Sequence, residues 1–352
     1  MRAIVLHERG THGPRLTERA VPERPADGVL VRMLAASVNR VDLYMRDSGQ
    51  GITHDLPLVM GVDGVGEVLE SGPGSAFRAG DRVILYPYDF CGRCRHCLDG
   101  DQPLCLRARI FGEHIDGTFT EVMAVPERAL LPLSPAADLH AAATLGVAYL
   151  TAWRMVLGRV PAGPGQVVFI QGAGGGVAHA ALQLARMAGA RVIVSTTGPG
   201  KLAHFQAEGV AAVDYRDPEM VAQVLALTGG AGADMVIDNV GAASWAQSLR
   251  VLGRGGQLMT CGATTGAHPS ADIQRLFVRQ LSVHGSTMGS LEEFRRLLAA
   301  FESGAFRPPI DSVFPLAEVP AAFARLEAAA RLGKIVIDIA DLRGAEPEAT
   351  TP

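Results

Sequence analysis

A glycine cluster at residues 172–176 follows the apolar run Val167–Ile170 and precedes a helix-period segment and a second apolar run at 191–194. This order of strand, turn, helix and strand predicts a βαβ unit with the glycines at its first turn. Because glycine has no Cβ, backbone N–H groups at such a turn can approach a dinucleotide pyrophosphate, which the helix dipole also attracts. We therefore expect the turn to bind a dinucleotide, with a turn that binds nothing as the alternative. The candidate contacts are Gly172, Gly174, Gly175, Gly176 and Val177.

The end of the second strand indicates which dinucleotide is bound. Sites for NAD commonly carry Asp or Glu about 20 residues after the glycines. Here the position reads Ser195, Thr196 and Thr197, with no acid among them, and Lys201 follows. Hydroxyl groups and an ammonium can bind a 2′-phosphate that a carboxylate would repel, and Tyr215 could close over it. The sequence therefore predicts NADP(H), with Lys201 as a solvated surface charge as the alternative.

Four of the five cysteines are close together in the sequence, at Cys91, Cys94, Cys97 and Cys105. Two residues between successive thiols let a turn wrap around one ion, and the returning chain supplies a fourth ligand. We expect one Zn²⁺ per chain, held by four sulfurs. With all four coordination positions filled, this zinc has no place for water or substrate and is structural. A disulfide pair is the alternative, which a reducing compartment disfavours.

Length and charge limit the remaining possibilities. A chain of 352 residues favours two domains over one core. A net charge of -4 gives no electrostatic case for binding nucleic acid or an anionic membrane. The first residues lack the apolar core of a signal peptide, and no apolar run reaches the ~18 residues of a membrane helix. We expect a cytoplasmic protein with a small-molecule substrate.

The secondary-structure pattern changes along the chain. Short apolar runs between proline and glycine turns predict a β-rich region up to about residue 133. A helix is expected at 141–157, leading into the nucleotide unit. Further helices and strands follow, including a helix at 318–332 and a last strand at 334–339. We expect the tail at 344–352, which is acidic and contains proline, to be disordered.

A β-rich start, a four-cysteine lobe and a central nucleotide unit, in this order, resemble the medium-chain dehydrogenase/reductase superfamily. The resemblance extends to SVNRVDLY at 37–44, GVDGVG at 61–66 and GKIVI at 333–337. It implies an α/β protein in which a GroES-like, β-rich catalytic domain is joined to a Rossmann domain with a doubly wound parallel sheet. In that family the active site lies between the two domains.

The resemblance also implies domain limits and an assembly. Residues 1–148 and 290–343 would form the GroES-like substrate domain, with the zinc lobe at 91–105. Residues 149–289 would form the Rossmann NADP(H)-binding domain. Relatives are commonly homodimers whose nucleotide-domain sheets join, which would use the strand at 281–285.

Alcohol-oxidising members of the superfamily carry a second, catalytic zinc. The positions of its ligands read Asn39, Val62 with Asp63, and Val147 in this sequence. Valine cannot ligate a metal, and Asp63 with Asn39 makes a poor site without imidazole or thiolate. We expect the catalytic zinc to be absent.

Without a Lewis acid, hydride transfer needs an acceptor that spreads the developing charge, such as an enone, enoyl thioester or quinone, or a side chain that supplies a proton. The sequence is similar to the quinone oxidoreductase and enoyl reductase branch, which it matches at Asn39, Val41, Asp42 and Tyr44. We predict an NADPH-dependent reductase of an activated double bond or quinone. Two alternatives stay open: a carbonyl reductase or alcohol dehydrogenase with Tyr44 as the acid, and a non-enzymatic binding protein that keeps the nucleotide fold.

The resemblance suggests roles for individual residues. Tyr44 would donate a proton or orient the acceptor oxygen, and Asn39 would hydrogen-bond that oxygen. Alternatively, Tyr44 packs under a loop and Asn39 caps a turn. Asp42 is interpreted as a structural hydrogen-bond acceptor. The nicotinamide half of the cofactor would contact Thr151, Asn239, Val240, Cys261, Gly262, Ser286 and Met288.

Overall fold

The computed structural model describes residues 1–49, 55–328 and 330–341, so the tail at 344–352 lies outside the described residues. The described chain divides into two compact units. Unit 1 comprises Met1–Val147, Ser290–Ser303 and the chain from Arg307 onward, and unit 2 comprises Ala148–Gly289 and Gly304–Phe306. Within the described ranges, no helix combines the length and the apolar character needed to cross a membrane.

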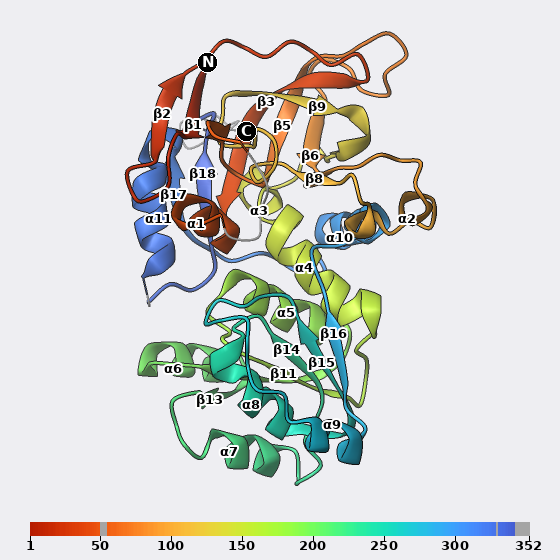
Figure 1. Ribbon diagram of the computed structural model, residues 1–352, viewed down its shortest axis with the longest axis vertical. Helices are drawn as coiled ribbons and strands as arrows, with labels where there is room; N and C mark the ends of the chain where they lie inside the picture. The colour runs from red at the N-terminus through yellow and green to blue at the C-terminus, as the bar shows by residue number, and fades with distance from the viewer. Residues whose placement is uncertain (50–54, 329, 342–352) are drawn as a thin grey trace, which may run out of the picture. The chain divides into compact units, whose positions relative to one another are not determined.

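Unit 1 consists mainly of β-strands (Figure 1). Its strands are β1 (Arg2–Leu6), β2 (Pro14–Glu18), β3 (Gly28–Val38), β4 (Leu58–Val59), β5 (Asp63–Glu70), β6 (Arg82–Leu85), β7 (Tyr88–Asp89), β8 (Arg109–Ile110), β9 (Val122–Pro126), β10 (Leu130–Pro132), β17 (Ile310–Pro315) and β18 (Lys334–Asp338). The largest sheet has the order β10–β6–β5–β3–β18–β17, and β9 also pairs with β3. Strand β18 therefore brings the C-terminal part of the chain against β3, antiparallel, with Ile335 opposite Val38.

The core of unit 1 follows from alternation along these strands. In β3, Val29, Val31 and Met33 are buried on one face and pack with Val83 and Leu85 of β6. Apolar side chains at every second position give each strand one face for the core, and antiparallel pairing lets neighbouring strands share it. The result is the β-rich GroES-like domain predicted from the sequence.

Helices of unit 1 are α1 (Arg40–Asp47), α2 (Arg95–Leu98), α3 (Leu139–Ala142), α10 (Leu291–Glu302) and α11 (Val319–Glu327). In α11, Val319, Ala322, Phe323 and Leu326 form one buried face. Figure 1 shows α11 beside β17 and β18. The helix predicted at 318–332 was too long. It ends at Glu327 because the backbone of the next residue is extended.

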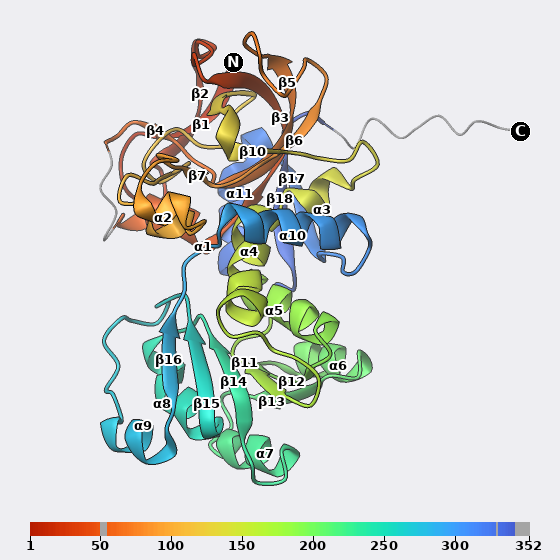
Figure 2. The same ribbon diagram turned by 90° about the vertical axis from the view of Figure 1, so that its right-hand side faces the viewer.

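Unit 2 is a parallel sheet covered by helices. Its strands are β11 (Val167–Ile170), β12 (Arg191–Thr196), β13 (Ala211–Asp214), β14 (Ala233–Asp238), β15 (Leu252–Thr260) and β16 (Ser282–Gly285), and its helices are α4 (Leu150–Trp153), α5 (Gly176–Met187), α6 (Pro199–Ala207), α7 (Met220–Leu227), α8 (Ala242–Val251) and α9 (Ile273–Arg279). The strand order β13–β12–β11–β14–β15–β16 is that of a doubly wound Rossmann sheet. The predicted fold class is thus confirmed. Figure 2 shows β16 at one edge of this sheet, beside β15, with α9 leading into it.

The connection into unit 2 differs from the single helix predicted at 141–157. It is broken into α3, α4 and two π-helical segments, Leu145–Tyr149 and Arg154–Arg159. Part of the reason is local: a Cβ on Gly146 would lie 2.8 Å from the Cβ of Asp63, so this turn approaches β5 closely. The next N–H, that of Val147, is donated to the Asp63 carboxylate. Such π-helical insertions are common near functional sites.

Candidate functional site

The glycine turn lies between the end of β11 and the start of α5. Gly172 has a φ of 68°, which favours a residue without a side chain. A Cβ on Gly172 would lie 3.4 Å from Cγ2 of Val240, and a Cβ on Gly175 would lie 3.9 Å from Nδ2 of Asn239. The structure therefore brings the predicted residues at the ends of β11 and β14 together. The remaining predicted residues of the turn and the first turn of α5 are Gly174, Gly176 and Val177.

At the end of β12, the structure agrees only in part with the expectation that Ser195, Thr196 and Thr197 bind a 2′-phosphate. Ser195 and Thr196 are 0% and 2% exposed, so their hydroxyls lie in the interior. The Ser195 hydroxyl donates to Oε1 of Gln171 at 2.5 Å and accepts from the Gly172 N–H at 3.1 Å. This burial argues against direct contact between Ser195 and a 2′-phosphate. Thr197 is half-buried and follows the strand.

Three cationic or aromatic side chains follow β12 or β13, the strand paired with it. Lys201 is in the first turn of α6, and Tyr215 follows β13 with its N–H donated to the Thr196 carbonyl at 3.1 Å. Arg216, which sequence reasoning missed, places its guanidinium 6.0 Å from the centre of the Tyr215 ring. The signal for it is a cation directly after a tyrosine at a strand end. Both Tyr215 and Arg216 are exposed.

Residues predicted to contact the nicotinamide half lie at the ends of β14, β15 and β16 and on α4. A Cβ on Gly262 would lie 2.9 Å from the Asn239 carbonyl oxygen, so glycine lets these two turns touch. The Thr151 hydroxyl lies 3.8 Å from Sδ of Met288. Ser286 is 7% exposed, and its hydroxyl has no hydrogen-bond partner among the residues that the structure describes. An unpartnered buried hydroxyl beside a glycine-lined turn fits a polar ligand such as a dinucleotide.

Cys261 follows β15 in the same region. It is half-buried. Burial raises the pKa of its thiol to about 12, and the Asp238 carboxylate adds to this. A thiol with a raised pKa is a poor nucleophile, so Cys261 is expected to contribute packing, not chemistry.

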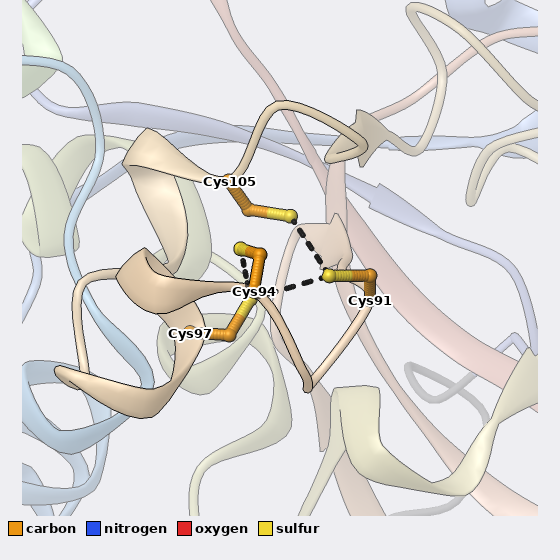
Figure 3. A group of neighbouring side chains, drawn as sticks. All are labelled: Cys91, Cys94, Cys97 and Cys105. Carbon is orange, nitrogen blue, oxygen red and sulfur yellow. Dashed lines mark hydrogen bonds between the residues drawn. The ribbon is translucent and has the colours of Figure 1, made fainter.

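The four cysteines of unit 1 converge, as Figure 3 shows. Their sulfur atoms all lie within 4.8 Å of one another, with distances of 3.6 Å for Cys94–Cys97 and for Cys105–Cys91. A zinc–sulfur bond of about 2.3 Å places tetrahedral ligands about 3.8 Å apart. The cluster thus fits a tetrahedral zinc ion. Within the described ranges, this is the one group of three or more Cys, His, Asp or Glu side chains close enough to hold a metal.

A second polar cluster surrounds Asp63 at the start of β5. Its Oδ1 accepts hydrogen bonds from the Ser37 hydroxyl at 2.7 Å and from Nδ2 of Asn39 at 3.0 Å. Its Oδ2 accepts the Val147 N–H at 3.1 Å. Asp63 and Ser37 are both 0% exposed. Both carboxylate oxygens are therefore engaged within the protein.

Lys334, the first residue of β18, completes this cluster. Its Nζ donates to Oδ1 of Asn39 at 2.5 Å and to the Val38 carbonyl at 2.9 Å. Burial lowers the pKa of Lys334 to about 8, while the nearby Asp63 carboxylate opposes that shift. Sequence reasoning missed Lys334, although a lysine inside the apolar stretch GKIVI was a signal. We name Ser37, Asn39, Asp63 and Lys334 the Asp63 cluster.

Two further acids lie near the Asp63 cluster. Burial raises the pKa of Asp42 to about 8, and Glu113 also raises it. Oδ2 of Asp42 accepts the Asn39 N–H at 2.7 Å, whereas its Oδ1 has no hydrogen-bond partner in the described part of the chain. Burial raises the pKa of Glu113 to about 7. Asp42 is thus positioned as a structural acceptor at the start of α1.

The Asp63 cluster does not fit a catalytic zinc ion. Val62 and Val147 have no side-chain atom that can bind a metal. Both carboxylate oxygens of Asp63 already accept hydrogen bonds from the protein. The Asn39 amide binds Asp63 through its nitrogen and Lys334 through its oxygen. Zinc sites are built from thiolate, imidazole and carboxylate groups with free lone pairs, which this set lacks.

Asn39 and Tyr44, the predicted catalytic pair, have different environments. Asn39 is 5% exposed and immediately precedes α1, and its contacts favour the capping role over a hydrogen bond to substrate. Tyr44 lies within α1 and is 40% exposed, between the buried Leu43 and Met45. Its side chain is therefore partly accessible within the described part of the chain. Helix α1 is held at its other end by Arg46, whose Nη2 lies 2.8 Å from Oε1 of Glu327.

Known proteins are similar to both halves of the chain. Residues 25–135 match the family of alcohol dehydrogenase GroES-like domains, and residues 176–303 match zinc-binding dehydrogenases. Alcohol dehydrogenase 1 of Emericella nidulans is 30% identical over 91% of this chain and 92% of its own. A solved structure of an NAD-dependent alcohol dehydrogenase is 36% identical, covers 96% of this chain and 100% of its own, and has a TM-score of 0.92. A cobalt- and zinc-bound thermostable alcohol dehydrogenase from Pyrobaculum aerophilum is 32% identical, covers 96% and 99%, and has a TM-score of 0.87.

These similarities extend over nearly the whole chain and agree with the order of elements in both units. They confirm the resemblance inferred from the glycine turn, the cysteine lobe and the β-rich start. The chain belongs to the zinc-type medium-chain dehydrogenase/reductase superfamily of oxidoreductases.

Proposed function

We propose that the chain is an NADPH-dependent reductase that transfers a hydride to an activated double bond or a quinone without a catalytic zinc ion. The observation that carries this proposal is the state of the Asp63 cluster, in which every polar side-chain group already has a partner from the protein. With no ligand set for a Lewis acid there, an acceptor that delocalises the developing charge is the substrate that suits the site.

The proposed cofactor site is in unit 2. The glycine turn and the unpartnered Ser286 hydroxyl would hold the dinucleotide, and bound NADPH would supply the hydride. Thr197, Lys201 and Tyr215, with Arg216 added, would bind the 2′-phosphate. Because one similar structure is an NAD-dependent enzyme, the competing hypothesis is NADH. Dissociation constants for both dinucleotides decide between them, and tighter binding of NADH would reject the NADPH preference.

Tyr44 is the proposed proton donor. Its exposed phenol, on a helix fixed at both ends, can deliver a proton to an acceptor without a change in the fold. Replacing a general acid typically costs 10²–10⁴-fold in rate, so we expect Tyr44→Phe to lower kcat/KM by at least ~10²-fold. Its melting temperature should stay that of the wild type, because the lost hydroxyl is on an exposed side chain. An unchanged kcat/KM would remove Tyr44 from the mechanism.

A second candidate is a zinc-independent carbonyl reductase or alcohol dehydrogenase with Tyr44 as the acid. It is favoured by the relatives, several of which are named alcohol dehydrogenases. NADPH oxidation measured with enones, enoyl thioesters, quinones and aldehydes separates the candidates. Fast turnover of aldehydes alone would support the second, and turnover of none would leave the non-enzymatic alternative.

We also propose one structural zinc per chain, held by the four cysteines, and a homodimer. Strand β16 is an edge of the unit 2 sheet, and beside it the apolar side chains Ile273, Phe277 and Val283 are 67%, 67% and 41% exposed. An exposed edge strand with apolar neighbours favours pairing with a second copy. Sedimentation equilibrium should give twice the chain mass of 37.0 kDa, and the single-chain mass would reject the dimer.

A further inference from the structure

A chain of buried hydrogen bonds links three neighbouring strand ends in unit 2. The Ser195 hydroxyl, on β12, donates to Oε1 of Gln171 at 2.5 Å. Nε2 of Gln171, directly after β11, donates to the Ser248 hydroxyl at 3.2 Å. That hydroxyl donates to Oδ2 of Asp238, at the end of β14, at 2.7 Å. We name these four residues the polar chain.

Each end of the polar chain holds one of the two turns that line the proposed cofactor site. At one end, Ser195 accepts the Gly172 N–H at 3.1 Å and so fixes the glycine turn. At the other end, Oδ1 of Asp238 accepts the N–H groups of Val240 at 2.8 Å and Gly241 at 3.1 Å. The turn after β14 is therefore held by the same carboxylate that ends the polar chain.

All four residues of the polar chain are buried, so losing one of these hydrogen bonds is costly. Gln171 is 2% exposed, and Ser195, Ser248 and Asp238 are all 0% exposed. Polar groups in such an interior are costly unless they are hydrogen-bonded, and bonds in sequence polarise one another. All the bonds of the polar chain point the same way, toward the Asp238 carboxylate. Ser244 supplies a further donor to that carboxylate at 2.7 Å.

We propose that the polar chain is a positioning network that fixes the glycine turn relative to the turn at Asn239–Gly241 and thereby sets the affinity for the dinucleotide, whichever one is bound. The inference rests on the proposed dinucleotide binding. Ser195 acts through the Gly172 N–H and does not touch the cofactor. It lies at the strand end where a residue selecting the 2′-phosphate was expected, yet its contribution should be the same for NADPH and NADH.

The test is Ser195→Ala in the full-length protein, with dissociation constants for NADPH and NADH measured by isothermal titration calorimetry. The variant leaves the Gly172 N–H and Oε1 of Gln171 without their partner. We expect both constants to rise by the same factor, about tenfold, as for a lost buried hydrogen bond. Ser248→Ala breaks the polar chain at another member and should give the same pattern. Ser282→Ala, on the edge strand β16, is the matched control and should change neither constant.

The outcomes are distinct. Weaker binding of NADPH alone would show that Ser195 contacts the 2′-phosphate and would overturn the proposal, as would two unchanged constants. If the wild type binds neither dinucleotide, the proposed function fails, but the polar chain can still be tested. Amide hydrogen exchange of peptides containing Gly172 and Gly241 should then be faster in Ser195→Ala than in the wild type. Unchanged exchange would overturn the positioning role.

Discussion

Two polar clusters of unit 1, the four cysteines and the Asp63 cluster, have opposite relations to a metal ion. Three pairs of cysteine sulfurs lie 3.6–3.9 Å apart and all four sulfurs lie within 4.8 Å of one another, a spacing that suits a shared zinc ion. In the Asp63 cluster, one ammonium, one amide, one hydroxyl and two carboxylate oxygens are paired with one another or with the backbone. The difference indicates that polar residues suit a metal ion better when N–H and O–H groups of the protein do not already occupy their acceptor atoms.

The clusters also differ in how they are stabilised. The cysteine lobe buries little apolar surface of its own, since Leu98 and Leu106 are 74% and 92% exposed. Such a lobe would depend on the proposed zinc ion for its order. The Asp63 cluster is enclosed by sheet strands, and its charges balance one another. Its stability should therefore depend on the ammonium of Lys334, not on any bound ion.

The largest expected effect is removal of one cysteine ligand. Cys97 is 8% exposed, and Cys97→Ser should reduce the zinc content from one per chain to nearly none. Loss of a structural metal is among the few changes that cost on the order of 5 kcal/mol or more, so we expect a loss of that size in the free energy of unfolding. Metal analysis by mass spectrometry and urea denaturation measure the two quantities.

The matched control is Cys261→Ser, which changes the cysteine outside the lobe and should leave one zinc per chain. A variant Cys97→Ser that still holds zinc would show that the cysteine cluster is not the site. Two zinc ions per wild-type chain would contradict the interpretation of the Asp63 cluster, because the second ion would need a site that this cluster does not offer.

The second effect concerns Lys334. Lys334→Met removes the ammonium that accompanies the buried Asp63 carboxylate. Lys334 and Asp63 interact through their charges. Leaving one of two interacting buried charges without the other can cost about 3–5 kcal/mol, and we expect a loss of up to this size in the free energy of unfolding from urea denaturation. The double variant Asp63→Asn with Lys334→Met removes both charges and should be more stable than Lys334→Met alone.

Lys201→Met provides the control, because it removes the only other lysine of the sequence, at a half-buried position in unit 2. A smaller change, of about 1 kcal/mol or less, is expected there, because Lys201 is half-buried whereas Lys334 is 4% exposed. If the double variant loses the sum of the two single losses, Asp63 and Lys334 are not coupled, and the Asp63 cluster is not charge-balanced as described.

Sequence reasoning succeeded where the determining contacts are local. Cysteine spacing predicted a four-sulfur group because the ligands come from one short segment, and the glycine turn predicted the Rossmann unit because strand, turn and helix are consecutive. The helix predicted at 318–332 ends at Glu327, and the chain beyond it contacts a residue distant in sequence, since Oδ1 of Asp311 accepts the Leu332 N–H.

Long-range contacts account for most of what the sequence did not reveal. Lys334 and Asn39 are separated by 295 positions, and only the antiparallel pairing of β18 with β3 brings them together. Ser195 was placed at the correct strand end, but the direction of its hydroxyl depends on Gln171 in the neighbouring turn. The residues surrounding a side chain are set by sheet order, which motif spacing does not encode.

The smallest expected effect is a pH dependence of the free energy of unfolding that comes from Glu113. Glu113 is 7% exposed, and burial raises its pKa from the ordinary 4.5 to about 7. The folded state therefore holds this proton more tightly than the unfolded state, so the stability it contributes is complete below pH 4.5 and is lost as pH rises toward 7. Glu113→Gln imitates the protonated form. At pH 5 its advantage over the wild type should be below about 1 kcal/mol, and at pH 8 it should be more stable by up to about 3 kcal/mol.

Urea denaturation of the wild type and Glu113→Gln at both pH values measures this difference. Glu318→Gln, which changes an exposed glutamate, should behave like the wild type at both. Asp42 lies near Glu113 and has its own raised pKa, so the wild type alone would not separate the two acids, whereas the difference between variants isolates Glu113. An advantage of Glu113→Gln that is equal at pH 5 and pH 8 would mean that the carboxyl is not held protonated. The carboxyl groups near the Asp63 cluster would then be ionised, and nearby positive charge would stabilise them in place of bound protons.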